Sequence, residues 1–270
     1  MSPAARQECL PLTIRWLGQA VFVLSGGGQR LLVDAWLSEH PLRVRSAPSI
    51  TDVPDGVGWL LATHEHGDHL DLPALPALFD RFPDLVVVVP EPLRARVMAA
   101  DSRARVHGVQ PGDLVDMGGV VVHVVHAWHG IEVGDGYSPG HALRPDGQTP
   151  FVGYVVVFPG ITVYHSGDTI AGAGLVEELR PLVVDVALLP ANGRDGRRER
   201  AGIVGNLDGR EAAELASAIG ARVLVPMHYD MVRGNRARIG PVVEAARNVH
   251  PSLAVLVPAV FSDLAIGLPE

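Results

Sequence analysis

A dense group of potential metal ligands follows the apolar residues Leu60–Ala62. His64, His66, Asp68 and His69 lie within six positions of one another. Neutral imidazole and carboxylate groups are the ligands that zinc, manganese and iron take near neutral pH. A buried core would need a separate partner for each of these side chains, and an ordinary solvated turn has no need of so many together. The spacing therefore predicts a metal site where a buried strand ends.

Three further stretches place His or Asp where a predicted strand passes into a loop. They are residues 126–129, 165–168 and 226–230. Asp34 also closes a predicted strand, and we expect it to point toward the same end of the sheet. Sheets carry their functional loops along one edge. We therefore expect these stretches to converge, although they lie far apart in the sequence.

The elements that must position these side chains follow from the apolar pattern. Strands are predicted over residues 13–17, 20–24, 30–34, 59–62, 85–89, 120–125, 151–158, 161–164, 183–189, 222–225 and 253–257. Helices are predicted in the later part of 70–82 and over 92–100, 208–219 and 240–249. This alternation predicts an α/β fold with layered sheets and helices. No linker or low-complexity tract interrupts it, so residues 1–270 are predicted to form one domain with two similar halves.

Composition limits the partners that the protein can have. The formal net charge of −8 argues against a nucleic-acid partner, whose binding surfaces are normally basic. The apolar runs are far below the ~18 residues needed to span a membrane. Met1–Leu10 does not read as a signal peptide, and the single Cys9 cannot form an internal disulfide. We expect a cytoplasmic protein with no nucleic-acid partner and no membrane partner.

The order of these ligands resembles that of the metallo-β-lactamase fold superfamily. Residues 63–69, Thr-His-Glu-His-Gly-Asp-His, match its HxHxDH motif. His129, Asp168 and His228 match the later ligands of the family. The resemblance covers nearly the whole chain and implies a four-layer αββα sandwich with two divalent metal ions, zinc or manganese, with iron also compatible. It implies that one ion is held by His64, His66 and His129, that the other is held by Asp68, His69 and His228, and that Asp168 bridges them.

The third ligand of the first ion has an alternative. His123, His126 and His129 are close in sequence, and the stretch Ala127–His129 resembles the family pattern just beyond the strand. We favour His129 and keep His126 as the alternative, because His123 lies within the strand. His165 is expected to support a ligand instead of binding metal.

A second set of segments resembles one branch of the superfamily. The segments Tyr164–Thr169, Leu189–Asp195, Gly205–Asn206 and Pro226–Met231 resemble those of L-ascorbate-6-phosphate lactonase and related metal-dependent hydrolases. That resemblance implies a cytoplasmic, manganese-using enzyme that opens an anionic lactone, and it also allows a homo-oligomer. This chain departs from the lactonase by a shorter N-terminal region and by a His in the third-ligand segment.

The implied mechanism is hydrolysis of a lactone or similar ester, with a metal-bridging hydroxide as the nucleophile. The catalytic residues are then Asp68 and Asp168, one of which orients the nucleophile or takes its proton. Arg194, Arg197 and Arg198 are candidate clamps for an anionic small-molecule substrate, since guanidinium pairs with carboxylate or phosphate. The alternative for these arginines is a solvated charged loop.

Other polar residues near these loops have two interpretations. Asn192 and Asn206 either bind substrate or shape turns, while Tyr229 and Asp230 are expected around His228. The loops at 130–150 and 191–206 are expected to select the substrate. The rival functions are a phosphodiesterase or nuclease of the same superfamily and a non-catalytic metal-binding sensor.

Overall fold

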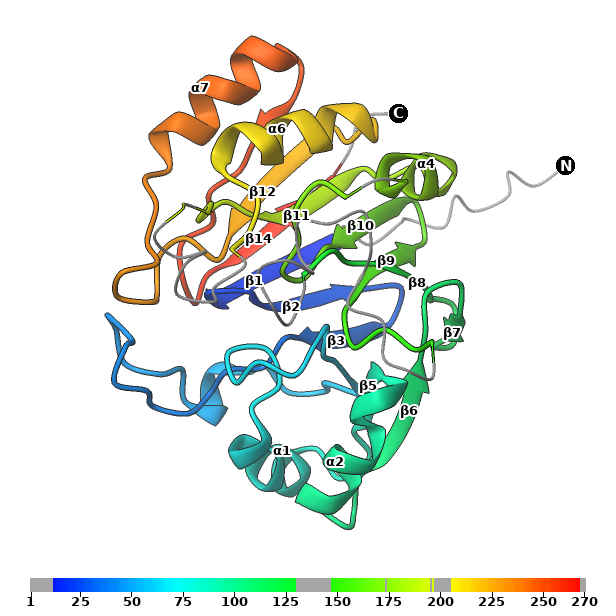
Figure 1. Ribbon diagram of the computed structural model, residues 1–270. Coiled ribbons are helices and arrows are strands. Elements are labelled where there is room, and N and C mark those ends of the chain that lie inside the picture. Colours follow the sequence, from blue (N-terminus) through cyan, green and yellow to red (C-terminus); the bar gives the residue numbers. More distant parts are fainter. Residues whose placement is uncertain (1–11, 130–146, 173, 195, 197–204, 268–270) are drawn as a thin grey trace, which may run out of the picture.

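The computed structural model describes residues 12–129, 147–172, 174–194, 196 and 205–267. Two seven-stranded sheets form its centre (Figure 1). The first has the order β14-β1-β2-β3-β4-β5-β6, and the second has the order β13-β12-β11-β10-β9-β8-β7. The strands of the first sheet are β1 (Leu12–Gly18), β2 (Val21–Gly26), β3 (Gln29–Val33), β4 (Trp59–Leu61), β5 (Val86–Pro90), β6 (Arg105–Val109) and β14 (Asp263–Ile266). Those of the second are β7 (Leu114–Asp116), β8 (Val121–His126), β9 (Val152–Phe158), β10 (Ile161–His165), β11 (Val186–Pro190), β12 (Val223–Met227) and β13 (Ala254–Val255).

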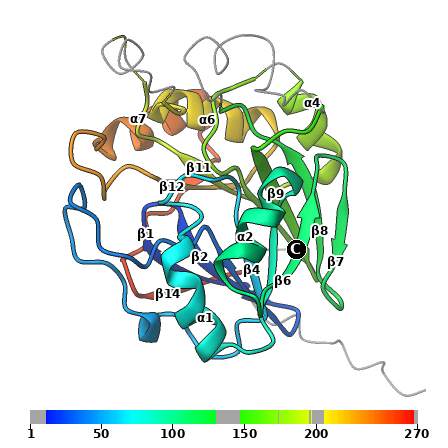
Figure 2. The ribbon, with the colours of Figure 1, turned by 60° about the horizontal axis from the view of Figure 1, so that its bottom comes forward.

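Helices cover the outer face of each sheet. The helices α1 (Leu75–Arg81) and α2 (Arg94–Ala100) pack on the first sheet, and α4 (Leu175–Leu179), α6 (Gly209–Ala218) and α7 (Gly240–Val249) pack on the second. Figure 1 shows α4, α6 and α7 above the sheets and α1 and α2 below them, and in Figure 2 α1 and α2 lie in front. The predicted order of layers, αββα, is therefore observed.

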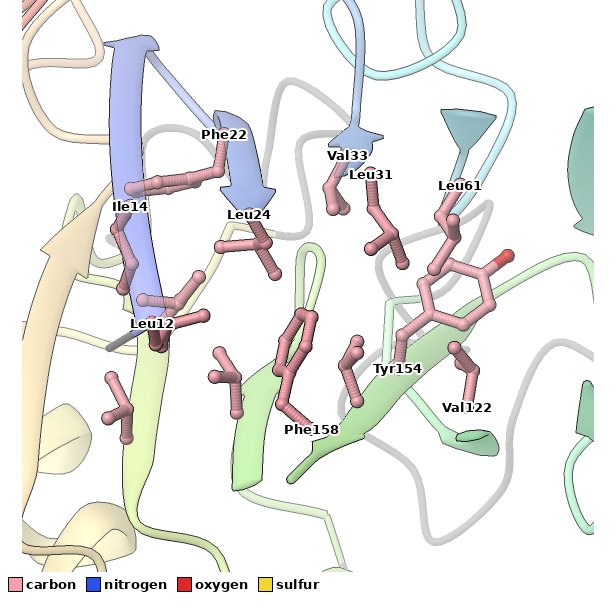
Figure 3. Close-up of a cluster of buried hydrophobic side chains, with 14 of the residues drawn as sticks. Leu12, Ile14, Phe22, Leu24, Leu31, Val33, Leu61, Val122, Tyr154 and Phe158 are labelled. Atoms are coloured by element: carbon pink, nitrogen blue, oxygen red, sulfur yellow. The ribbon is translucent and has the colours of Figure 1, made fainter. Parts of the chain in front are cut away.

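Three apolar clusters hold these layers together. The largest lies between the two sheets, where Leu24 of β2 faces Phe158 of β9 and Leu61 of β4 faces Tyr154 of β9 (Figure 3). The intervening residues of β2, including Val23, point instead to the helices of the first sheet. Because both faces of the sheet are buried, such strands read as continuous apolar runs. This explains why runs such as that of β5 show no polar alternation.

The helix predictions were largely confirmed. The side chain of Asp208 accepts hydrogen bonds from the backbone N–H groups of Arg210 and Glu211, and Glu211 reaches back to the backbone of Asp208. This reciprocal cap starts α6 as the sequence indicated. Pro73 and Pro76 lie in the first turns of a short 3-10 helix (Leu72–Ala74) and of α1, where a missing N–H is tolerated.

Three strands and one helix had no clear sequence signal. They are β6, β7, β14 and α4. The edge strands β7 and β14 are short and largely exposed, and β14 pairs with β1, about 250 residues away in the chain. Edge strands bury little apolar surface, so the alternation that identifies a strand is weak there.

The strand directions place the predicted site. In the first sheet β3, β4 and β5 are parallel, and in the second β10, β11 and β12 are parallel. β1 and β3 are both antiparallel to β2, so β1 runs in the same direction as β3. In the same way, β8 and β10 are both antiparallel to β9, so β8 runs in the same direction as β10. Their carboxyl ends therefore lie at one edge.

Within the described part of the chain, no helix has the length and apolar character that crossing a membrane requires.

Candidate metal centre

Seven side chains from both sheets come together at this edge. They form two groups, with His64, His66, His129 and Asp168 in one and Asp68, His69 and His228 in the other. Potential ligand atoms within each group lie within 4.8 Å of one another. All seven were singled out in the sequence, and their grouping follows the predicted division between two ions.

The first group has its imidazoles in close contact. Nε2 of His64 lies 2.9 Å from Nδ1 of His66, and the rings of His64 and His129 have centroids 5.2 Å apart. Nε2 of His129 is 3.8 Å from Oδ2 of Asp168. His66 is exposed, while His64, His129 and Asp168 are buried, so the group opens to solvent on one side.

Asp168 connects the two groups. Its Oδ1 lies 3.4 Å from Nε2 of His69 and 3.3 Å from Nε2 of His228, while its Oδ2 faces His129. Oδ2 of Asp68 is 3.2 Å from the same Nε2 of His228. One carboxylate thus presents one oxygen to each group, which is the arrangement that a ligand shared by two ions needs.

These residues fit a pair of divalent ions. Two bonds of about 2.0–2.1 Å that meet at 90–110° separate the ligand atoms by roughly 2.9–3.4 Å. The close contacts of 2.9, 3.2, 3.3 and 3.4 Å fall in that range. Nε2 of His69 and Oδ1 of Asp168 are buried, and neither makes an aligned hydrogen bond with any described residue. Buried polar atoms without a partner are costly, and a cation supplies that partner.

The electrostatics of the site divide the imidazoles. Burial lowers the pKa of His129 to about 4 despite the attraction of Asp168, and burial together with the neighbouring His69 and His66 lowers the pKa of His64 well below its ordinary value. Burial alone would also lower the pKa of His69, but the nearby carboxylates of Asp168 and Asp34 raise it well above that value. His64 and His129 are therefore neutral and ready to coordinate, while His69 must exchange its proton for a cation.

Asp34 fixes the orientation of His69. Its fully buried carboxylate accepts hydrogen bonds from the backbone N–H of Thr63 at 2.8 Å and from the Thr63 hydroxyl at 2.9 Å, and Oδ2 lies 2.7 Å from Nδ1 of His69. This contact leaves Nε2 of His69 directed at Asp168 and Asp68. A carboxylate behind a histidine fixes the ring and raises its basicity as a ligand. The sequence placed Asp34 at the correct edge without assigning it this contact.

The two sheets are joined directly beneath the motif. The hydroxyl of Tyr154 donates to the carbonyl of Ala62 at 2.8 Å, and the backbone N–H of Val152 donates to the carbonyl of Thr63 at 3.0 Å. Gly167 has φ +60°, and a Cβ there would lie 2.7 Å from Cβ of Thr63. Only glycine allows the segment before Asp168 to approach this closely.

Gln19 is a site residue that sequence reasoning missed. It is buried with φ 52°, and its Nε2 lies 2.8 Å from both Oδ2 of Asp68 and Nε2 of His228. Its backbone carbonyl accepts hydrogen bonds from the backbone N–H of His228 and from the indole of Trp16, each at 3.0 Å. The turn between β1 and β2 therefore reaches into the second group. Its left-handed backbone has no signal in the sequence, since glutamine rarely adopts it.

His129 joins the cluster and His126 does not. The ring and backbone N–H of His126 contact the carboxylate of Glu178 on α4, with Nδ1 3.1 Å from Oε1. His123 lies within β8, opposite Leu114 of β7. His165 is buried and its Nε2 lies 2.9 Å from the carbonyl oxygen of Ala20, so it supports the β10 end beside the cluster.

The predicted substrate-binding residues are built into the loops around the site. Asn206 donates to Asn192 at 3.1 Å, Asn192 donates to Asn235 at 3.0 Å, and both Asn192 and Asn206 are buried. The guanidinium of Arg194 forms a two-point ion pair with Glu211. Arg197, Arg198 and most of the 130–150 loop lie outside the described residues.

The predicted surroundings of His228 are more indirect than expected. Tyr229 stacks on Trp16 with ring centroids 5.6 Å apart. Oδ1 of Asp230 accepts a hydrogen bond from the backbone N–H of Gln19 at 3.3 Å. Both therefore act on the segment that holds Gln19, and through it on His228.

Comparison with known proteins agrees with this fold. Residues 29–229 match the family model described as a beta-lactamase superfamily domain. A UPF0173 metal-dependent hydrolase from Methanosarcina mazei is 31% identical over 241 residues, which cover 87% of this chain and 91% of the relative. A metallo hydrolase from Ignicoccus hospitalis has a TM-score of 0.72 at 19% identity, over 96% of this chain and 99% of that one. The metallo-beta-lactamase fold protein YhfI from Bacillus subtilis has a TM-score of 0.67 at 14% identity, over 94% of this chain and 99% of that one. The predicted fold is thereby confirmed.

Proposed function

The chain belongs to the UPF0173 metal-dependent hydrolase family of the beta-lactamase superfamily, and we propose that it hydrolyses a lactone or similar ester bond with two divalent metal ions. The observation that carries this proposal is the position of Asp168. Its two carboxylate oxygens face different groups of imidazoles, and Oδ1 is buried without an aligned hydrogen bond from the described residues. A structural salt bridge would satisfy both oxygens.

The seven side chains would divide between the two ions. His64, His66 and His129 would hold one ion, Asp68, His69 and His228 would hold the other, and Asp168 would contact both. Bound divalent ions lower the pKa of a coordinated water and polarise an electrophilic oxygen. The same imidazole and carboxylate set suits zinc, manganese and iron.

The protein residues then position the reactants and handle the proton. Asp68 has 23% of its side chain exposed, whereas Asp168 and Asp34 are almost fully buried. Asp68 is therefore the carboxylate of the three that can both touch the second ion and take a proton from the attacking water. Asp168 and the imidazoles hold the reacting groups in place, and this positioning supplies a large part of any rate enhancement.

An anionic substrate remains a prediction from the arginine-rich loop. Arg194 is engaged with Glu211. If the substrate carries an anion, Arg197 and Arg198 remain the proposed clamps. The likeness to the ascorbate-6-phosphate lactonase branch stays a prediction, and we extend it only to the type of bond that is cleaved.

A substrate screen tests this function. Protein loaded with manganese or zinc would be assayed against lactones, carboxylic esters, thioesters and phosphodiesters, together with Asp168→Ala and a control, Asp84→Ala, at an exposed ion pair remote from the cluster. We expect hydrolysis of lactones or esters, its loss in Asp168→Ala, and wild-type rates in Asp84→Ala. Turnover of phosphodiesters alone would replace the proposed substrate with the rival one. Full activity of Asp168→Ala would overturn the two-ion mechanism.

A further inference from the structure

A cavity of about 460 Å³ opens beside the second ligand group. Gly67 and Asp68 form part of its lining, so the cavity begins at a residue assigned to the metal centre. Its volume lies within the range of small-molecule binding sites, about 300–1,000 Å³. The described residues of the segments predicted to select the substrate do not contribute to the lining, which comes from the loops after β3, β4 and β12 and from α2.

The walls of this cavity are mostly apolar. Trp36 follows β3, Leu70, Leu72 and Pro73 follow the ligand motif, and Val232 follows β12. Apolar side chains exposed together in a cavity are costly to leave in water, and burial of a complementary apolar group recovers that free energy.

The walls are also held in place. The guanidinium of Arg43 lies 3.9 Å from the ring centroid of Trp36 and donates to the Trp36 carbonyl at 3.3 Å. Arg43 and Val232 form an isolated antiparallel β-bridge, which ties the loop after β3 to the loop after β12. The carboxylate of Asp71 accepts hydrogen bonds from the backbone N–H groups of Leu37 and Ser38 at 2.8 and 2.6 Å. The cavity is therefore pre-formed, which reduces the cost of binding.

The charged groups of the lining are engaged with the protein. Arg96 pairs with Glu65 at 2.7 Å, Asp71 is occupied by backbone N–H groups, and Glu39 accepts a hydrogen bond from the backbone N–H of Ala47 at 2.9 Å. Among the described lining residues, Arg96 is the one side chain with a permanent positive charge. With Glu65 paired to Arg96, Glu39 and Asp71 leave this wall without a cationic partner for an anionic group of a substrate.

We propose that this cavity binds an uncharged, apolar group of the substrate while the scissile bond lies at the metal centre. The substrate would then be a lactone or ester with an alkyl or aryl substituent, and any anionic group would lie elsewhere. This inference rests on the proposed function for its catalytic part, but the binding step does not depend on catalysis.

Binding of an uncharged probe tests the cavity alone. Octanamide would be titrated into the metal-loaded protein by calorimetry, with octanoate and octylammonium as charged comparisons. Val232→Phe fills one wall, and Val257→Phe makes the same change at an exposed position outside the lining. We expect octanamide to bind at least tenfold more tightly than octanoate, with binding weakened at least tenfold by Val232→Phe and unchanged by Val257→Phe. Equal binding by Val232→Phe, or a preference for octanoate or octylammonium, would overturn the proposal.

Hydrolysis of a homologous series tests the connection to the metal centre. For γ-lactones with alkyl substituents of increasing length, kcat/KM should rise by about three- to fourfold per buried methylene until the cavity is full. Val232→Phe should flatten this rise, whereas Val257→Phe, outside the lining, should leave it as in wild type. Hydrolysis without any dependence on chain length would reject the cavity as the substrate site and leave the hydrolase function intact. No hydrolysis of any lactone or ester would reject the proposed function, and octanamide binding would still decide the cavity.

Discussion

Oδ2 of Asp34 lies 2.7 Å from Nδ1 of His69, although the two residues lie in loops that follow different strands of the first sheet. The same carboxylate receives two hydrogen bonds from Thr63, so it is locked by the residue that precedes the ligand motif. The orientation of His69 is thus set before any ion binds.

Asp34→Asn should weaken metal binding without removing a ligand. The amide cannot reproduce the negative charge behind His69, and loss of such a partner costs about 10–100-fold in metal affinity. Competition with a fluorescent chelator would measure the change. The control is Asp263→Asn on β14, which alters an exposed ion pair with Arg15 of β1. Unchanged affinity in Asp34→Asn would show that the contact with His69 has no effect on the ion.

Gln19→Ala should affect the two ions unequally. Its carboxamide contacts Asp68 and His228, which belong to the second group, and not the imidazoles of the first group. We expect the affinity of one ion to fall about tenfold or more while the other binds as in wild type. Titration with elemental analysis at limiting metal would reveal this as loss of one equivalent. Gln29→Ala serves as the control. Equal loss of both ions from Gln19→Ala, or metal binding by Gln19→Ala as in wild type, would contradict the assignment.

Gly172→Ala should disturb His129 through its neighbour. A Cβ on Gly172 would lie 2.0 Å from the ring of Trp128. The backbone N–H of Trp128 donates a hydrogen bond to the hydroxyl of Thr169 at 3.0 Å, which holds this residue in place. Overpacking of this kind costs about 1–3 kcal/mol. Chemical denaturation of the metal-free protein would measure the loss of stability, and metal titration would measure the effect on the first group. Gly58→Ala is the matched control, because nothing lies within 4 Å of a Cβ there.

The cap of α6 should make stability depend on pH. Burial would raise the pKa of Glu211, but hydrogen bonds from Arg194 and from the backbone of Asp208 lower it below its ordinary value. Its contribution is therefore complete above the pKa of the unfolded state and is lost as pH falls through the lower pKa of the folded state. Glu211→Gln should lower the free energy of unfolding by about 1 kcal/mol at pH 7.

Urea titrations at pH 7 and at pH values down to 4 would follow this difference. The difference in the free energy of unfolding between wild type and Glu211→Gln should become smaller toward pH 4. Glu214→Gln, on an exposed i,i+4 pair with Arg210, should show a smaller gap. A gap that widens on acidification would mean that the pKa of Glu211 is raised, not lowered.

The parts of this protein that could be predicted from sequence have local causes. The motif from His64 to His69 was recognisable because its density of imidazoles and carboxylate has no structural use in a core, and α6 was recognisable because both partners of its cap are three residues apart. The edge strand β14 and the contact of Gln19 with His228 depend on residues more than 200 positions away. No window of sequence contains both partners, so neither was predicted.

The residues that line the proposed cavity carried no comparable sequence signal. The arginine-rich segment looked functional because of its charge, yet Arg194 pairs with the α6 cap. Trp36 and Val232 looked ordinary, since isolated apolar residues in loops carry no signal. The bridge between Arg43 and Val232 and the ion pair between Arg45 and Asp230 bring those two loops together. Roles for Arg197 and Arg198 stay predictions.

The ligands are divided between the two sheets, since His64 to His69 follow β4 and the remaining three follow β8, β10 and β12. Ions bound by ligands from both sheets would stabilise the contact between the two halves of the sandwich. A ligand that binds only the native state adds about 2.7 kcal/mol of stability at a concentration 100 times its Kd. Removal of the ions by a chelator would therefore lower the stability of the contact between the two sheets as well as any activity.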